Sequence, residues 1–164
     1  MTAELGTWAG RCGHTIVFGG VNCGLMECVA KAASEAGGRT IGVIPMIIER
    51  GGRVSHYVDV DIPCDNLSDR KQLILDHADV FVALPGGIGT MDEVFTVVAS
   101  ATIGYHGKRV VLYNMKGFWD KLIDTLDDLQ HRGMVRGEWR KYIGVANSLE
   151  EVMELLSDIA PREE

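Results

Sequence analysis

The sequence predicts a doubly wound α/β fold, in which a mainly parallel sheet carries helices on both faces. Two observations predict it. Short apolar runs alternate with longer segments of helical periodicity along the 164 residues. Runs such as Val80-Phe81-Val82-Ala83-Leu84 are apolar without alternation, which is typical of strands that helices cover on both sides. In such sheets, ligands bind at the carboxyl ends of the strands.

Six short runs are expected to be strands because they are apolar and bounded by turn residues. They are His14 to Phe18, Arg39 to Ile44, Tyr57 to Ile62, Asp79 to Leu84, Arg109 to Tyr113 and Tyr142 to Val145. Five periodic segments are expected to be helices. They are Asn22 to Ala36, with Gly37-Gly38 as its C-cap, Asn66 to His77, Thr90 to Thr102, Phe118 to His131 and Ser148 to Ile159. No linker or repeat is visible, so residues 1–164 are expected to form a single nucleotide-binding domain.

Composition excludes several classes of partner. The formal net charge is −7 and the isoelectric point about 5.2, which argues against a nucleic-acid or anionic-membrane surface. The apolar runs are too short to span a bilayer, and no secretory signal is visible, so a cytoplasmic location is expected. The four cysteines show no C-x-x-C spacing and the five histidines no metal-binding motif, so free cysteines in the core and no metal are expected.

A glycine-rich loop between a strand and a helix is the main functional signal. It reads Pro85-Gly86-Gly87-Ile88-Gly89-Thr90-Met91-Asp92-Glu93. Glycines leave room for a ligand and permit positive φ angles that gather backbone N–H groups into one concavity. A helix starting at Thr90 would add its first N–H groups and the positive end of its dipole. The pattern predicts a phosphate site, with Glu93 as a carboxylate that phosphate binding alone does not require.

The same residues have a structural interpretation. Thr90-Met91-Asp92-Glu93 fits a capping box, in which Thr90 caps the helix and Glu93 bonds back to it. Ser148-Leu149-Glu150-Glu151 repeats the pattern, and there only a cap is expected. The preceding glycines favour the phosphate site, since a cap requires none, although both roles can coexist.

A second glycine turn and a basic pair belong to the same predicted sheet edge. Phe18-Gly19-Gly20-Val21 follows the first predicted strand, and two glycine loops at one edge make a binding crevice. Arg70-Lys71 lies in the first turns of the helix before the strand that leads to Pro85. From position alone, Arg70 is either a solvated surface charge or a bidentate ligand of phosphate or ribose oxygens.

These residues resemble a known family. Pro85-Gly86-Gly87-x-Gly89-Thr90-x-x-Glu93, preceded by Arg70-Lys71, resembles the signature of the Lonely Guy (LOG) phosphoribohydrolases. Gly24-Leu25-Met26, Gly42-Val43-Ile44-Pro45 and Gly104-Tyr105-His106-Gly107-Lys108 extend the resemblance over most of the chain. It implies a Rossmann-like fold and release of the base from nucleoside 5′-monophosphates, notably cytokinin ribotides. Such proteins are also called lysine decarboxylases, but the sequence gives no sign of a pyridoxal phosphate site.

The resemblance implies roles for individual residues. Gly86, Gly87, Gly89 and Thr90 would hold the 5′-phosphate, and Arg70 and Glu93 would be the catalytic pair. The remaining predicted substrate-binding residues are Gly19, Gly20, Lys71 and Pro85. No metal or organic cofactor is implied. A homodimer is favoured, with Phe95, Val97, Val98 and Ile103 as a possible apolar contact, although packing of this helix on its own sheet explains the same residues.

The chain departs from the family pattern in two ways. It opens at Ala3-Glu4-Leu5-Gly6, where the family has the end of its first helix, so the family's first strand and its Gly-Ser loop are expected to be absent. Val21, Leu67-Ser68, Ser100 and Thr102 also differ from common family residues, which leaves open whether AMP or a cytokinin ribotide is preferred.

Two other functional classes are kept as alternatives. One is a non-catalytic nucleotide or molybdenum-cofactor carrier, since related folds with a similar loop bind that cofactor. The other is a P-loop phosphotransferase, but Gly89-Thr90 lacks the spacing and the lysine of that motif. The aromatic residues Trp119, Trp139 and Tyr142 are expected to pack in the core, since no glycine loop accompanies them.

Overall fold

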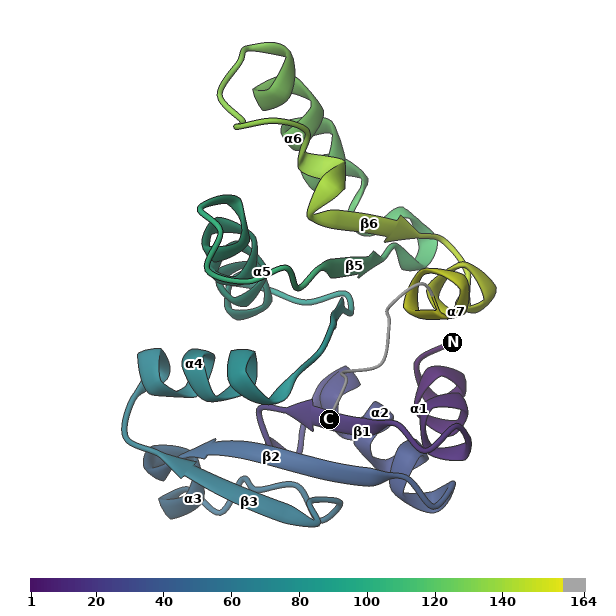
Figure 1. The fold of residues 1–164 in the computed structure, drawn as a ribbon. Coiled ribbons are helices and arrows are strands. Elements are labelled where there is room, and N and C mark those ends of the chain that lie inside the picture. Colours follow the sequence, from purple (N-terminus) through teal and green to yellow (C-terminus); the bar gives the residue numbers. More distant parts are fainter. Residues whose placement is uncertain (158–164) are drawn as a thin grey trace. The chain divides into compact units, whose positions relative to one another are not determined.

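The computed structural model describes residues 1–157, which fall into two compact units, Met1–Ala78 and a second that begins at Asp79 (Figure 1). Each unit holds a three-stranded parallel sheet with its own helices. The predicted α/β class with parallel strands is therefore confirmed. That residues 1–164 form one domain stays a prediction, and the two units are described in turn.

The first unit orders its strands β1-β2-β3. Its elements are α1 (Thr2–Arg11), β1 (Thr15–Phe18), α2 (Gly24–Glu35), β2 (Arg39–Pro45), α3 (Met46–Arg50), β3 (Val60–Cys64) and α4 (Leu67–His77). Phe18 pairs with Gly42 and Pro45 with Cys64, so the strands end at one edge of the sheet. Helix α4 contacts all three strands, and α1 packs on α2.

The second unit orders its strands β4-β5-β6. Its elements are β4 (Phe81–Ala83), α5 (Ile88–Thr102), β5 (Val110–Tyr113), a 3-10 turn (Met115–Gly117), α6 (Asp120–His131), a second 3-10 turn (Trp139–Lys141), β6 (Ile143–Ala146) and α7 (Leu149–Ser157). Helix α5 contacts β4 and β5, and α7 contacts β5 and β6. The loops that follow the three strands share one edge, because all pairs are parallel.

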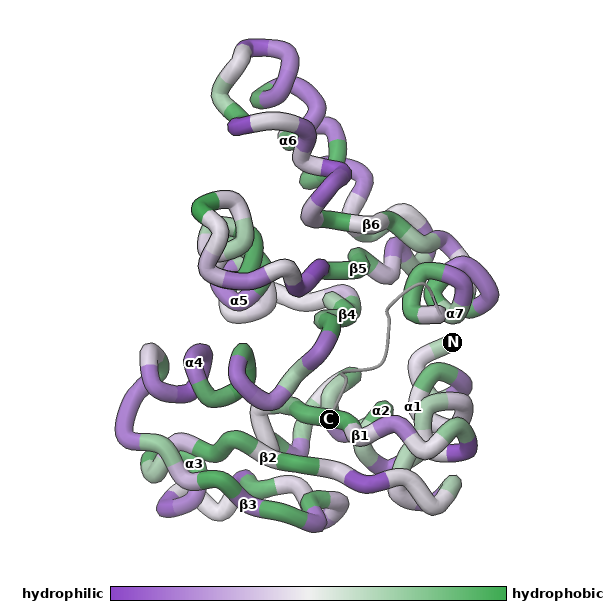
Figure 2. Tube along the Cα trace, viewed as in Figure 1, coloured by the Kyte–Doolittle hydropathy of each residue, from purple (hydrophilic) through white to green (hydrophobic). Residues whose placement is uncertain are grey.

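The cores lie where strands meet helices. Figure 2 shows hydrophobic residues along β2 and β5. Val43 and Ile44 of β2 are buried, as is every residue of β5, so the prediction that both faces are covered holds for β5 and not for the run Val80 to Leu84. Strand β4 is less enclosed, since Phe81 and Val82 are half-buried and only Ala83 is buried. In the described residues, none of the helices is long and apolar enough to cross a membrane.

Several boundaries differ from the prediction. Ala3-Glu4-Leu5-Gly6 lies in the first half of α1 rather than at a helix end, because the helix continues until Gly13 takes a left-handed φ of 77°. The sequence also missed α3, which has only five residues. Helix α7 is described to Ser157, so the rest of its predicted span lies outside the described residues.

Within each unit the three strands pair as one sheet, in which β1 and β4 are edge strands. Hydrogen-bond pairing between strands is a tertiary property, and the apolar runs of the sequence do not specify it.

Candidate functional site

The predicted site residues fall into two groups, one in each unit. The first unit holds Gly19, Gly20, Arg70 and Lys71. The second holds Pro85, Gly86, Gly87, Gly89, Thr90 and Glu93. Both groups follow the carboxyl ends of parallel strands, where the fold class predicts a ligand site.

In the first unit, Arg70 lies against the glycine turn. Helix α4 begins after Asn66, whose Oδ1 accepts from the N–H groups of Ser68 (2.8 Å) and Asp69 (3.0 Å). Arg70 is therefore in the second turn of the helix. A Cβ added to Gly19 would overlap Nη2 of Arg70 and lie 2.9 Å from its Cζ. Arg70 is half-buried, so its interpretation as a solvated surface charge is wrong.

Gly20 is fixed by both conformation and space. Its φ is +66°, in the left-handed region that glycine favours, and an added Cβ would overlap the Ile44 side chain of β2. The Gly20 carbonyl accepts from Ser55 N–H at 2.8 Å, and the nearby Asn22 N–H donates to the Arg53 carbonyl at 2.9 Å. The turn is thus attached to residues 53–55 and presents Gly19 to Arg70.

The charge of Arg70 also acts on the end of β3. Burial raises the pKa of the Cys64 thiol, and the positive charge of Arg70 partly opposes this shift. A surface pocket of about 360 Å³ lies beside Cys64. Its lining is Pro63, Cys64, Asp65, Asp69, Gln72 and Leu73. The two aspartates make this pocket unsuitable for a phosphate, whereas the guanidinium of Arg70 is suited to one.

In the second unit, the glycine loop leads directly into α5. Gly87 is the N-cap with φ −93° and ψ −151°, and the helix begins at Ile88, two residues before the predicted start. None of Gly86, Gly87 and Gly89 has a positive φ, so the expectation that this loop needs left-handed glycines is wrong. The glycines instead provide space: a Cβ on Gly86 would overlap Thr90 Oγ1, while Gly87 and Gly89 are exposed.

The two similar helix starts differ in their caps. At α7, Ser148 Oγ accepts from Glu151 N–H at 3.2 Å, and Glu151 Oε2 accepts from Asn147 N–H at 2.7 Å. The predicted cap is confirmed there. At α5, the N-cap is Gly87, which has no side chain to accept from the first N–H groups, and Thr90 lies inside the first turn. The capping-box interpretation of Thr90 is therefore wrong, and the first N–H groups of α5 are available to an anion.

Glu93 lies one turn after Thr90 on the same helix. Residues three apart share a helix face, so its half-buried carboxylate is on the side of Thr90. Asp92 is exposed, and neighbouring helix positions point about 100° apart. Val94 and Val97, both buried, hold α5 on its sheet. The helix thus begins at a glycine N-cap and carries a carboxylate one turn after Thr90.

The sequence reasoning missed a hydrogen-bond network at this edge of the second unit. Asn114 follows β5 and is 5% exposed. Its Nδ2 donates to Asp120 Oδ1 (2.8 Å) and Asn147 Oδ1 (3.1 Å), and its Oδ1 accepts from Trp119 N–H (2.7 Å). Asparagines directly after two apolar strands were the signal that could have revealed it.

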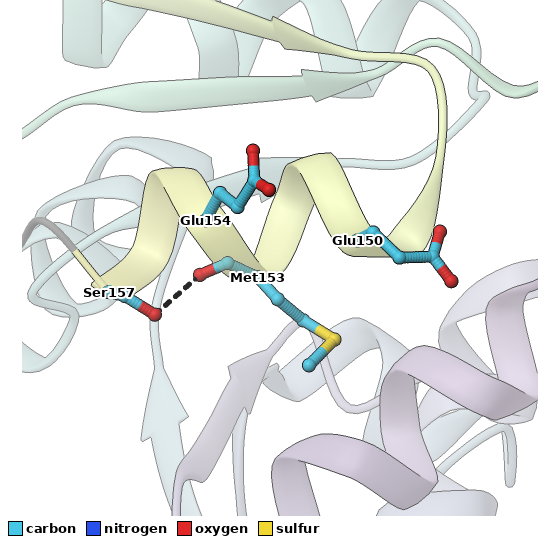
Figure 3. A pocket seen from close by; sticks show the side chains of 4 residues that line it. All are labelled: Glu150, Met153, Glu154 and Ser157. Atoms are coloured by element: carbon cyan, nitrogen blue, oxygen red, sulfur yellow. Dashed lines mark hydrogen bonds between the residues drawn. The ribbon is translucent and has the colours of Figure 1, made fainter.

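A hollow on α7 has no relation to these groups. It encloses about 460 Å³ and is lined by Glu150, Met153, Glu154 and Ser157 (Figure 3). Ser157 Oγ donates to the Met153 carbonyl of its own helix at 2.8 Å. With two carboxylates and no cation in its lining, this hollow does not suit an anionic ligand.

The exposed fractions of the other predicted residues can be compared with their expected roles. Val97 is 5% exposed, which favours the packing alternative for this residue, whereas Phe95 (41%) and Ile103 (60%) are on the surface. Trp119 and Trp139 are both 2% exposed, which confirms that they are packing residues. Cys12, Cys23, Cys28 and Cys64 are free, but Cys12 and Cys23 are exposed and only Cys64 is buried, so the expected core location is wrong for Cys12 and Cys23.

The chain is similar to known phosphoribohydrolases in sequence. A family model described as possible lysine decarboxylase matches residues 26–156. The cytokinin riboside 5′-monophosphate phosphoribohydrolase of Mycobacterium tuberculosis is 37% identical over 135 residues, covering 82% of this chain and 72% of that protein. Cytokinin riboside 5′-monophosphate phosphoribohydrolase LOG1 of Arabidopsis thaliana is 33% identical over 161 residues, covering 98% and 76%.

Solved structures with the same fold include two that handle a cofactor. The molybdenum cofactor binding protein of Rippkaea orientalis matches with a TM-score of 0.70 and 25% identity, covering 96% of this chain and 85% of that one. The molybdenum cofactor carrier protein of Chlamydomonas reinhardtii matches with a TM-score of 0.71 and 26% identity, covering 97% and 86%. Both support the fold, which by itself does not fix a function.

Proposed function

Because this chain belongs to the LOG family, we propose that it hydrolyses the N-glycosidic bond of purine nucleoside 5′-monophosphates to free base and ribose 5-phosphate. The observation that carries the proposal is the start of α5. A motif that forms a side-chain cap at α7 leaves the end of α5 uncapped, and an uncapped helix N-terminus after a glycine loop is a site for phosphate.

In this proposal, the glycine loop and the start of α5 in the second unit bind the phosphate. The N–H groups at the start of α5 donate to its oxygens, and the helix dipole adds favourable potential. Gly87 and Gly89 carry no side chain between helix and ligand, while Gly86 leaves room for the Thr90 hydroxyl. That hydroxyl is a further donor to the phosphate, and Pro85 borders the loop.

Glu93 acts on the ribose. As the C1′–N bond breaks, its electron pair leaves with the base, which takes a proton from water, and positive charge develops on the ribose ring. A carboxylate one helical turn from the phosphate site stabilises that charge. Glu93 then accepts a proton from the water that adds to C1′ and returns it to the hydroxide left when water protonated the base, so that one water is consumed in all.

Arg70 positions the nucleotide. Its planar guanidinium forms bidentate bonds with phosphate or ribose oxygens, and one charge-assisted bond is worth about 1.5–3 kcal/mol. The contact with Gly19 supports this role, since a half-buried guanidinium on a glycine has few rotamers to lose on binding. Gly20 shapes the turn, and the half-buried Lys71 adds positive charge beside it.

We also infer that the protein acts as a homodimer and in the cytoplasm. The exposed Phe95 and Ile103 on and after α5 are the apolar residues that a second copy would cover. AMP and cytokinin ribotides share the 5′-phosphate and the ribose, so both are substrates to compare.

The proposal is tested by hydrolysis of AMP and isopentenyladenosine monophosphate, with released base measured by chromatography. Glu93→Gln is expected to lower kcat by about 10²- to 10⁴-fold, the range for loss of a general base. Asp92→Asn is the matched control, because it removes the neighbouring, exposed carboxylate of the same helix. Equal activity of the wild type and Glu93→Gln would refute the catalytic role.

The alternative function is that of a nucleotide or molybdenum-cofactor carrier. Its support is that the two structural relatives are described as a molybdenum cofactor binding protein and a molybdenum cofactor carrier protein. A carrier has no use for a carboxylate beside the ribose. Binding of AMP without release of base, and unchanged binding in Glu93→Gln, would therefore support the carrier.

A further inference from the structure

The glycine loop leaves its sheet with little support from the strand ladder. Strand β4 has only three residues and, in its sheet, only β5 as a neighbour. The last ladder pair joins Ala83 to Leu112. From there to Ile88, the chain has neither strand nor helix structure. A loop that must present several N–H groups to a phosphate needs another restraint at this exit point, because orientation costs entropy.

Trp119 supplies a bond at that point. Its indole Nε1–H donates to the Ala83 carbonyl at 3.3 Å, and the residue is 2% exposed. The Ala83 carbonyl belongs to the same planar peptide unit as the Leu84 N–H. Fixing this carbonyl therefore fixes the direction in which the chain enters the loop, two residues before Pro85.

Trp119 is held in place by Asn114. The Asn114 Oδ1 accepts from Trp119 N–H (2.7 Å), and Asn114 N–H donates to the Ala146 carbonyl at the end of β6 (2.7 Å). Both hydrogens of its Nδ2 are used as well, on Asp120 and Asn147. Asn114 and Trp119 are buried, Asp120 and Asn147 are exposed, and the Asn114 amide uses its oxygen and both of its hydrogens, which holds Trp119 in one position.

The turn before Trp119 is built for this contact. Lys116 and Gly117 have left-handed φ values of 54° and 72°, which reverse the chain within the 3-10 turn. A Cβ on Gly117 would overlap the Asp120 carboxylate, the same carboxylate that accepts from Asn114. The strained Lys116 conformation indicates that this turn is fixed by its surroundings.

We propose that Trp119, held by Asn114, is a positioning residue for the phosphate loop at Pro85–Gly89. The proposal rests on the function proposed above for that loop. Trp119 does not touch the ligand; its indole N–H fixes the carbonyl from which the loop begins, and the carboxyl ends of all three strands of this sheet are thereby linked.

The chain contains a matched control. Trp139 is also 2% exposed, and its indole Nε1–H also makes one bond, to Asp127 Oδ1 of α6 at 2.7 Å. Trp139→Phe removes a shorter bond from an equally buried indole but leaves the Ala83 carbonyl untouched. Trp119→Phe keeps an aromatic side chain but removes the indole N–H together with part of the buried ring volume, and Trp139→Phe loses the same volume at an equally buried position.

Hydrogen exchange of peptides covering residues 84–91 is measured in both variants, together with the steady-state constants for AMP. In Trp119→Phe, loop amides are expected to exchange about 10-fold faster and KM to rise about 3- to 10-fold with kcat within about twofold, the pattern of lost ground-state binding. In Trp139→Phe, both readouts should match the wild type. Equal loop exchange in the two variants would overturn the proposal, whatever their activity.

The exchange measurement needs no substrate, so it separates this proposal from the proposed reaction. Faster loop exchange in a protein that hydrolyses no nucleotide would uphold the positioning role and reject the reaction. If Trp119→Phe does not fold, the wild-type Trp119 indole N–H signal is assigned by elimination with Trp8→Phe and Trp139→Phe. Addition of ribose 5-phosphate should then shift that signal, and an unchanged signal at saturation would overturn the proposal.

Discussion

Two adjacent glycines in the first unit show how different constraints act on one residue type. At Gly19 the neighbouring atoms are the end of a flexible arginine side chain. At Gly20 they are Ile44 of a buried strand, and the backbone is also left-handed. An added methyl group therefore displaces a functional group at Gly19 and strains the fold at Gly20.

Gly19→Ala is accordingly expected to fold normally and lose activity. The methyl group moves the Arg70 guanidinium away, and loss of one charge-assisted bond should lower kcat/KM by about 10- to 100-fold. The free energy of unfolding should change by less than about 1 kcal/mol, since only a side-chain end must move. Urea denaturation and AMP hydrolysis measure the two effects.

Gly20→Ala is the contrast. A left-handed alanine costs about 1–2 kcal/mol, and overlap with Ile44 adds to it, so the urea midpoint should fall clearly. If Gly19→Ala is instead the more destabilised variant, or keeps full activity, Arg70 does not depend on this contact.

At the scale of elements, two helices with the same start motif differ in what satisfies their first N–H groups. Helix α7 uses the side chains of Ser148 and Glu151. Helix α5 begins two residues before its motif, at Ile88, so that Thr90 and Glu93 are displaced into the helix. The displacement follows from Gly87, which takes the extended N-cap conformation itself.

Replacement of each hydroxyl residue by alanine separates a cap from a binding group. Ser148→Ala is expected to lower the free energy of unfolding by about 1 kcal/mol, the usual value of a lost N-cap. Thr90→Ala should change it by less than about 0.5 kcal/mol, since alanine is the better helix former, and should raise KM for AMP. A loss of stability in Thr90→Ala as large as in Ser148→Ala would restore the capping interpretation.

At the scale of the whole molecule, each unit places its candidate residues on loops after parallel strands. The strands and buried helix faces determine where these loops start, and short-range contacts such as Trp119 to Ala83 determine their direction. Phe95 and Ile103 are among the large apolar side chains that remain exposed on and after α5.

The mass in solution tests the inferred dimer. Light scattering of the wild type is expected to give twice the chain mass of 17.9 kDa. Ile103→Glu, alone or with Phe95→Glu, should give the single-chain mass because a carboxylate in an apolar contact is costly to bury. Met134→Glu changes another exposed apolar residue and serves as control. A wild type with the single-chain mass would reject the inference.

The sequence by itself determined the class of fold, the six strands, the long helices and the residues of both candidate groups. These features depend on periodicity, burial and local motifs, which adjacent residues encode. Only the tertiary structure decided that Arg70 lies on Gly19, that Thr90 is no cap, that Val97 faces inward, and that Trp119 bonds to Ala83. It also decided which strands pair within each unit. Each of these features depends on contacts between residues that packing and strand pairing bring together from distant parts of the sequence. A local pattern of residues cannot predict such contacts.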